Sequence, residues 1–254
     1  MFWSCQFRLR LVATEVTLCT CANNGPEMKP VLIITRPDPD GARFAAAVTE
    51  AVAVDVILSP LMEIVPLDAQ CQADEVVFTS TNGVGQAARL GLKSGRAWCV
   101  GDRTAEMARE AGFDAVSAQG TVEDLLALIL AEGPKAALGH IRGKEARGDL
   151  GPRLRANGIN CVDVVAYAQV AVPLTDIAKA VIEGADPVII PLFSPRSADL
   201  LIGQVKIGPH VKVLAMSDAV ARMLPNVAVE VISRPDGDAM HNAVVAALRA
   251  CLRV

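Results

Sequence analysis

The chain has 254 residues, and 52% of them are hydrophobic, which is enough to bury the core of one or two domains. Its formal net charge is −4 and it has no run of Lys and Arg, which argues against a general nucleic-acid-binding protein, because neutralising phosphates requires a basic surface. No stretch of about 18 uncharged apolar residues occurs, so no membrane span is expected.

The cysteines and histidines of the chain lack the spacing of metal ligands. Cys19 and Cys21 form a C-x-C pair, but no second pair of Cys or His accompanies them. The number of cysteines, 7, is odd, and those in apolar runs are expected to be reduced core residues. No metal site is therefore predicted.

Residues 1–27 show neither a helical nor a strand period, so they are predicted to be a non-native or disordered extension. From residue 31 onward, short β-rich runs alternate with Ala- and Leu-rich helical stretches, which is typical of parallel α/β layers. Strands are predicted at residues 31–35, 76–79, 97–100, 114–117, 136–142 and 159–172, and helices at residues 38–51, 82–90, 102–110, 121–131 and 145–156.

After residue 173 the same alternation begins again, but it lacks a first strand of its own. Strands are predicted at residues 188–192, 211–215 and 227–232, and helices at residues 175–183, 197–205, 218–224 and 237–252. The strand at residues 31–35 is the natural candidate to complete this second set, which makes the corresponding domain discontinuous.

The sequence thus predicts an α/β protein with two similar parallel-sheet domains and an active site in the cleft between them. Domain A comprises residues 28–53 plus 173–254, and domain B is inserted at residues 66–160. The crossings, residues 54–65 and 161–172, are long and rich in Val, so they are predicted to pair as an antiparallel two-stranded ribbon.

Polar turns follow the predicted strands in both halves. Two turns of the first half are echoed by two turns of the second half, separated by nearly the same number of residues. Helices that begin with Ser, Thr, Asn or Asp at such turns leave backbone N–H groups directed outward, which suits an anionic ligand. Each turn taken alone is also explained as an ordinary helix cap. The candidate ligand-binding residues are Arg36, Thr79, Ser80, Asn82, Arg103, Thr104, Arg142, Gly143, Ser194, Arg196 and Ser217.

The run from Gly83 to Ala88 formally matches the G-x-G-x-x-A dinucleotide fingerprint. Four polar residues separate it from the preceding strand, and no acidic residue ends the next strand to bind a ribose. We interpret the match as coincidental and expect no nucleotide cofactor. The chain also lacks the sequence motifs of P-loop, zincin and serine-hydrolase sites.

Tyr167 is the only tyrosine, and it falls within the second crossing strand, where a side chain can face the cleft. A half-buried aromatic residue on a strand needs no function. Its phenol is nevertheless the one unambiguous weak acid at the predicted hinge, so Tyr167 is the candidate catalytic residue.

Taken together and in order, several motifs resemble those of the uroporphyrinogen-III synthases of tetrapyrrole biosynthesis, over residues 30–252. Residues 32–37 resemble the opening strand of that family, and residues 78–84 its most recognisable turn. Residues 100–105 resemble the strand, turn and helix that follow. The segments at residues 141–143, 164–167 and 193–195 complete the resemblance.

The resemblance implies closure of the linear tetrapyrrole hydroxymethylbilane to uroporphyrinogen III, with inversion of the last ring, loss of water and no cofactor. Eight substrate carboxylates would meet the helix N-termini and arginines, and Tyr167 would be the weak acid. A cytoplasmic monomer that transiently contacts the preceding pathway enzyme is expected. One departure concerns residues 216–219, where Ala219 replaces a hydroxyl residue frequent in the family.

Two other readings stay open from the sequence. A catalytically silent relative would use the same fold and arginines as a tetrapyrrole-binding regulatory module. A periplasmic-type small-ligand binding protein would share the two domains and the hinge, but it should carry an export signal.

Overall fold

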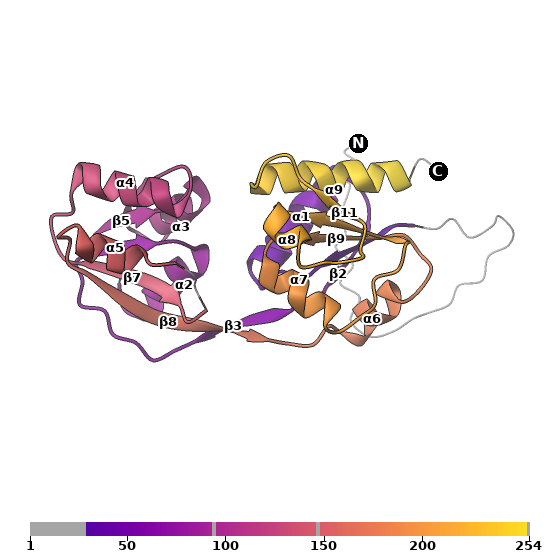
Figure 1. Ribbon diagram of the computed structural model, residues 1–254, viewed down its shortest axis with the longest axis horizontal. Helices are drawn as coiled ribbons and strands as arrows, with labels where there is room; N and C mark the ends of the chain where they lie inside the picture. The colour runs from indigo at the N-terminus through magenta and orange to yellow at the C-terminus, as the bar shows by residue number, and fades with distance from the viewer. Residues whose placement is uncertain (1–28, 93–94, 146–147, 253–254) are drawn as a thin grey trace, which may run out of the picture.

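The computed structural model describes residues 29–92, 95–145 and 148–252 of the chain. The extension predicted at residues 1–27 lies outside the described residues. Two halves, each built on its own sheet, lie side by side and are joined by strands β3 and β8 (Figure 1). None of the helices in this described part of the chain is long and apolar enough to cross a membrane.

The first sheet contains five parallel strands in the order β11-β10-β9-β1-β2. Their bounds are β1 (Val31–Ile34), β2 (Asp55–Leu58), β9 (Val188–Leu192), β10 (Val211–Ala215) and β11 (Val229–Val231). The predicted completion of this sheet by the N-terminal strand is confirmed, because β1 lies between β9 and β2.

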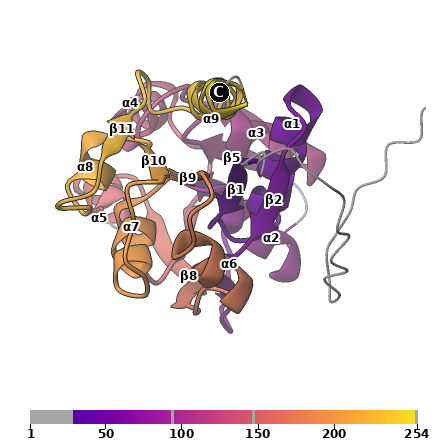
Figure 2. The same ribbon diagram turned by 90° about the vertical axis from the view of Figure 1, so that its right-hand side faces the viewer.

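Helices cover both faces of the first sheet, as Figure 2 shows. One face carries α6 (Asp176–Ile182), α7 (Pro195–Ile202) and α8 (Asp218–Ala221), and the other carries α1 (Asp40–Ala51) and α9 (Gly237–Cys251). Side chains alternate along a strand, so Ile33 packs against the first layer while Leu32 and Ile34 pack against the second. This explains why the strands are hydrophobic throughout rather than at every second residue.

The second sheet has six strands in the order β3-β8-β7-β4-β5-β6, and only the β3–β8 pair is antiparallel. The strand bounds are β3 (Met62–Pro66), β4 (Glu75–Phe78), β5 (Arg96–Cys99), β6 (Asp114–Ser117), β7 (Leu138–Gly143) and β8 (Cys161–Ala171). Helices α2 (Thr81–Arg89) and α3 (Asp102–Glu110) cover one face, and α4 (Val122–Glu132) and α5 (Leu150–Ala156) cover the other.

The predicted ribbon between the halves needs one correction. Residues 54–65 do not form a single crossing strand, because β2 pairs with β1 inside the first sheet and only β3 pairs with β8. The β8 strand also pairs with β7 as far as Tyr167. The part of β8 that crosses between the halves without pairing with β7 is therefore shorter than expected. Pro60 between β2 and β3 has no N–H to donate, which fits a break at that point. The other domain limits stay a prediction.

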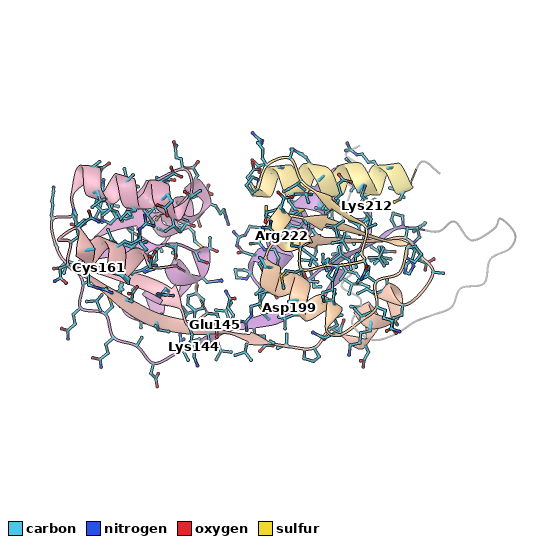
Figure 3. All side chains as sticks on the ribbon, in the orientation of Figure 1. Lys144, Glu145, Cys161, Asp199, Lys212 and Arg222 are labelled. Carbon is cyan, nitrogen blue, oxygen red and sulfur yellow. The ribbon has the colours of Figure 1, made fainter. Side chains whose placement is uncertain are left out.

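The helix predicted at residues 145–156 begins only at Leu150. Gly148 has a φ of 106°, which lies outside the helical region, and Glu145 accepts a hydrogen bond from the Gln169 N–H at 2.8 Å. Glu145, just after β7, is therefore held against the crossing strand, and α5 starts only after Gly148. Figure 3 places Lys144 and Glu145 beside this crossing, between the two halves.

Candidate active site

The two halves make direct contact where helix α1 of the first sheet meets helix α2 of the second. The carboxylate of Asp40 pairs with Arg36 at 3.0 Å and with Arg43 at 2.9 Å. It also accepts a hydrogen bond from the Thr81 hydroxyl at 3.3 Å. Asp40 thus connects two arginines of the first half to the N-terminal turn of α2.

Arg36 follows β1 and combines several contacts at this junction. Its guanidinium carbon lies 4.2 Å from the centre of the Phe193 ring, which follows β9. Burial lowers the pKa of the Arg36 guanidinium; Asp40 raises it and offsets part of that effect, and the charge of Arg103 lowers it further. Arg103 belongs to the second half, so a charge of one half influences the pKa of a guanidinium group in the other.

A cavity of about 210 Å³ lies at the same junction. Its lining residues are Asp38, Pro39, Asp40, Ile64, Thr81, Asn82, Gly85, Gln86 and Met107. This volume is below the roughly 300–1,000 Å³ of typical small-molecule sites. Two aspartates also line it, so the cavity itself does not have the positive character that the sequence predicted for the cleft.

Ser80 forms the N-cap of α2, and its hydroxyl accepts a hydrogen bond from the Asn82 N–H at 3.2 Å. Thr79, one residue earlier, instead contacts His140 on the neighbouring strand β7, with Oγ1 and Nε2 separated by 3.2 Å. The other ring nitrogen of His140 lies 2.9 Å from Asp163 Oδ1 on β8. The polar turn after β4 thus contains both a helix cap and the end of a side-chain network.

Tyr167 is only 3% exposed, and its ring packs in the core between the second sheet and helices α2 and α3. An added Cβ on Gly143 would lie 2.6 Å from Tyr167 Cε2, so the tyrosine ring occupies the space that this glycine leaves. Burial raises the pKa of the Tyr167 phenol, and hydrogen bonds with the Ser80 side chain and the Gly143 backbone offset part of that rise. The ring does not face the cleft as expected; its hydroxyl end is at Ser80.

The corresponding turns of the first sheet hold three further predicted residues. Ser194 is the N-cap of α7 and accepts a hydrogen bond from the Ser197 N–H at 3.1 Å. Arg196 donates to the backbone oxygen of Gln169 at 2.8 Å, which ties α7 to the crossing strand. Ser217 is the N-cap of α8, with no hydrogen bond from its side chain to the helix.

The remaining predicted residues occupy positions that are less suitable for direct contact with a ligand. Thr104 is 5% exposed and lies within α3, so its side chain is a packing residue rather than an open ligand contact. Arg103 is exposed and pairs with Glu106 at 3.0 Å. Arg142 lies 3.7 Å from Asp163, inside the network of β7 and β8. Both arginines are therefore close to acidic side chains of the protein itself, Arg103 to Glu106 and Arg142 to Asp163.

Sequence reasoning missed several residues of the junction. Asp38 and Asp40 fall at the start of the helix predicted at residues 38–51 and were not among the candidate ligand-binding residues, and His140 carried no signal because its partners lie 61 and 23 residues away. Figure 3 places the exposed Arg222, which follows α8, on the side of the first half that faces the second. Among the described residues, no group of three or more His, Cys, Asp and Glu side chains is arranged to hold a metal ion.

Comparison with known proteins agrees with this architecture. The family described as "Uroporphyrinogen-III synthase HemD" matches residues 43–242. The chain is similar to the crystal structure of uroporphyrinogen-III synthetase from Helicobacter pylori 26695, with 14% identity and a TM-score of 0.63, over 87% of this chain and 100% of that one. No curated protein matches the chain significantly in sequence.

A mutant uroporphyrinogen III synthase from the extremely thermophilic bacterium Thermus thermophilus is similar too, with 17% identity and a TM-score of 0.51, over 87% of this chain and 99% of that one. At such identities the solved structures show a shared fold. The family match covers most of the chain, including Tyr167, the N-terminal turn of α2 and every strand of both sheets except β1. The chain therefore belongs to the uroporphyrinogen-III synthase family.

Proposed function

We propose that this protein is a uroporphyrinogen-III synthase, which cyclises hydroxymethylbilane to uroporphyrinogen III with inversion of ring D and loss of water. The observation that carries the proposal is the family match over residues 43–242, which spans the turns that follow the strands of both sheets, except the turn after β1. The enzyme is then a cyclising lyase.

The substrate carries acetate and propionate groups, so a binding site needs many donors and a few guanidinium groups. The N-terminal turns of α2 and α7 offer backbone N–H groups, and Arg36 and Arg103 contribute charge from the two halves. Ser80, Asn82, Ser194, Arg196 and Ser217 are proposed to share the binding of these carboxylates, together with Gly143, Arg142 and the backbone N–H of Thr104 in the second half. Thr79 is proposed to contact the substrate at the carboxyl edge of the second sheet.

The proposed reaction is redox-neutral. Loss of the terminal hydroxyl as water, assisted by electrons of the pyrrole nitrogen, leaves an electrophilic carbon. That carbon bonds to the substituted α-carbon of the terminal ring and gives a spiro intermediate, which reopens and recloses with the ring inverted. Loss of a proton completes the product, so no oxidant or cofactor is required.

Tyr167 is proposed as the weak acid that assists the departing hydroxyl. Its raised pKa keeps the phenol protonated at neutral pH, and its interaction with Ser80 directs it toward the N-terminus of α2. General-acid catalysis typically contributes roughly 10²- to 10⁴-fold. Because the ring is 3% exposed, contact with substrate requires the second sheet and α2 to shift slightly on binding.

Positioning of the substrate is proposed to supply most of the selectivity. A cavity of about 210 Å³ accommodates only part of a tetrapyrrole, so binding requires the two halves to separate and close again around it. The β3–β8 connection is the natural hinge, since only two adjacent strands cross there. Closure would then hold the terminal ring in the orientation that gives the inverted isomer.

The decisive experiment is the isomer ratio of the product. Purified protein is incubated with hydroxymethylbilane, the product is oxidised to porphyrin, and isomers I and III are separated. Closure without inversion gives isomer I, so a large excess of isomer III supports the proposal. Isomer I alone, at the uncatalysed rate, would refute it and favour the silent tetrapyrrole-binding module.

We further expect the protein to act as a monomer in the cytoplasm, and to receive its substrate by transient contact with the enzyme that makes it. Light scattering during gel filtration checks the first point. Turnover after treatment with a chelator checks the expectation that no metal is needed, and a loss that one metal restores would contradict it.

A further inference from the structure

Three neighbouring strands of the second sheet carry a continuous side-chain network. Thr79 Oγ1, just after β4, lies 3.2 Å from His140 Nε2 on β7, and His140 Nδ1 lies 2.9 Å from Asp163 Oδ1 on β8. His140 is 5% exposed, whereas Thr79 is only half-buried at the carboxyl edge of the sheet. The network therefore runs from a buried imidazole to a hydroxyl that reaches the edge.

The charged groups around His140 determine whether its imidazole is neutral and which ring nitrogen is protonated. Asp163 is close to two guanidinium groups, with Arg142 at 3.7 Å and Arg155 at 3.5 Å, so its negative charge does not depend on an imidazolium. Burial lowers the pKa of His140, and Arg142 lowers it further, while Asp163 raises it. Cys161 on β8, near the His140 backbone, has a thiol whose pKa is raised to about 11 and therefore adds no charge.

A neutral His140 has one proton on its ring. The Asp163 carboxylate can only accept, so the proton is on Nδ1 and Nε2 is left as an acceptor. The Thr79 hydroxyl must then donate to Nε2. Because this bond uses the hydroxyl proton, the lone pairs of Thr79 Oγ1 are what the residue can offer to a ligand at the edge of the sheet.

We propose that the His140–Asp163 pair positions the Thr79 hydroxyl as a hydrogen-bond acceptor for a pyrrole N–H of the substrate. This inference rests on the proposed function, because it requires a tetrapyrrole at the carboxyl edge of the second sheet. A substrate carboxylate would meet only lone pairs at Thr79 Oγ1 and be disfavoured. Thr79 would thus distinguish the pyrrole rings from their carboxylate side chains.

The proton arrangement is tested directly by nitrogen-15 spectroscopy of the imidazole in the whole protein at neutral pH. The expected spectrum shows His140 protonated at Nδ1 and unprotonated at Nε2, with the Nε2 resonance shifted in Thr79→Val because that variant loses the hydroxyl donor. A proton on Nε2 in the wild-type protein would overturn the proposal, whether or not the chain produces isomer III.

The substrate contact is tested by steady-state kinetics with hydroxymethylbilane. Thr79→Val keeps the side-chain volume and should raise KM about tenfold with a smaller change in kcat, while Thr79→Ser should restore the wild-type KM. His140→Phe keeps a ring but no acceptor and should also raise KM. In the double variant Thr79→Val with His140→Phe, the increases in KM should not multiply, because both substitutions disrupt the same Thr79–His140 hydrogen bond.

The pH dependence separates positioning from a purely structural role. When His140 becomes protonated in acid, Nε2–H donates to Thr79, and the hydroxyl turns outward as a donor. Because the pKa of His140 is lowered, KM of the wild-type protein should rise only as the pH falls below the ordinary histidine pKa of 6.5, and KM of Thr79→Val should not follow. If KM of the wild-type protein and KM of Thr79→Val depend on pH in the same way, the proposal is overturned. A wild-type protein that makes no isomer III would instead refute the proposed function itself.

Discussion

The hydroxyl of Thr81 lies 3.3 Å from a carboxylate oxygen of Asp40, so a residue of α2 on the second sheet donates a hydrogen bond to a residue of α1 on the first. Asp40 is also paired with Arg36 and Arg43. An internal carboxylate thus already occupies the place where an incoming substrate carboxylate would meet these arginines. In the proposed complex, binding has to exchange the Asp40 carboxylate for one of the substrate.

This exchange predicts that Asp40→Asn binds substrate more tightly. The variant removes the competing charge, so KM should fall roughly two- to tenfold, while stability should change by about 1 kcal/mol or less because the pairs are partly exposed. Thr81→Val is the matched control, since it removes only the hydrogen bond between the halves and should change KM less than about twofold. A higher KM in Asp40→Asn would mean that Asp40 itself contacts the substrate.

The guanidinium groups of Arg36 and Arg103 should both contribute to binding. Each change to Ala should raise KM about tenfold at low ionic strength, and the effect should shrink as salt is added. Arg89→Ala is a suitable control, because Arg89 also carries a charge on the second half but contacts Gln86 at the far end of α2. The anion hypothesis fails if Arg36→Ala, Arg103→Ala and Arg89→Ala have the same KM.

The alternation of strands and helices was predictable because parallel sheets covered on both faces require continuous hydrophobic strands. Residues such as Leu32, Ile33 and Ile34 are buried on alternate faces, which the sequence reveals as one apolar run. Ser80 and Ser194 were also recognisable, because a hydroxyl residue between a strand and a helix is a typical N-cap.

The contacts of the site were much less predictable, because they join residues that are distant in the chain. Asp40 and Thr81 are 41 residues apart, and Thr79 and His140 are 61 apart. The position of Tyr167 on a crossing strand was apparent, but its burial was not, because alternation along the strand is disturbed between Arg142 and Gly143 of the neighbouring strand. Only the register of β7 and β8 places the ring on Gly143.

Tyr167→Phe should reduce turnover about 10- to 100-fold and should also cost up to about 1 kcal/mol of stability, because the interaction of the phenol with the Ser80 side chain is lost. Ser80→Ala removes the other partner of the same bond. If the phenol acts at Ser80, the double variant should be no slower than Tyr167→Phe alone. Turnover and thermal unfolding are measured for all three variants. Unchanged turnover in Tyr167→Phe, with isomer III still formed, would assign the phenol a structural role.

The lowered pKa of His140 predicts how stability depends on pH. The unfolded chain binds a proton at this residue near the ordinary pKa of 6.5, whereas the folded protein resists protonation until a lower pH. The contribution of neutral His140 to stability is therefore fully present above about 6.5 and is lost progressively as the pH falls from that value toward the lower pKa of the folded protein. His140→Phe should unfold at a temperature that changes less between neutral and mildly acidic pH. An equal change of the unfolding temperature in the wild-type protein and in His140→Phe would contradict the lowered pKa of His140.

The two glycines of the G-x-G-x-x-A run should respond in opposite ways to substitution. An added Cβ at Gly83 would lie 2.7 Å from the backbone oxygen of Ile141 and 3.3 Å from Phe78, whereas nothing lies within 4 Å of one at Gly85. Gly83→Ala should therefore destabilise the protein by about 1–3 kcal/mol, because α2 must move away from β7. Gly85→Ala should stabilise it by up to about 1 kcal/mol, because Ala favours the interior of a helix.

Denaturant unfolding of the two glycine variants measures these changes, and the comparison tests how the motif is used. Gly83 allows α2 to pack closely on β7, and Gly85 only lines the cavity between the halves. A phosphate-binding loop would instead need both glycines for the approach of a ligand to the backbone. Equal destabilisation by the two substitutions, or a gain in stability on adding a dinucleotide, would contradict the close-packing explanation.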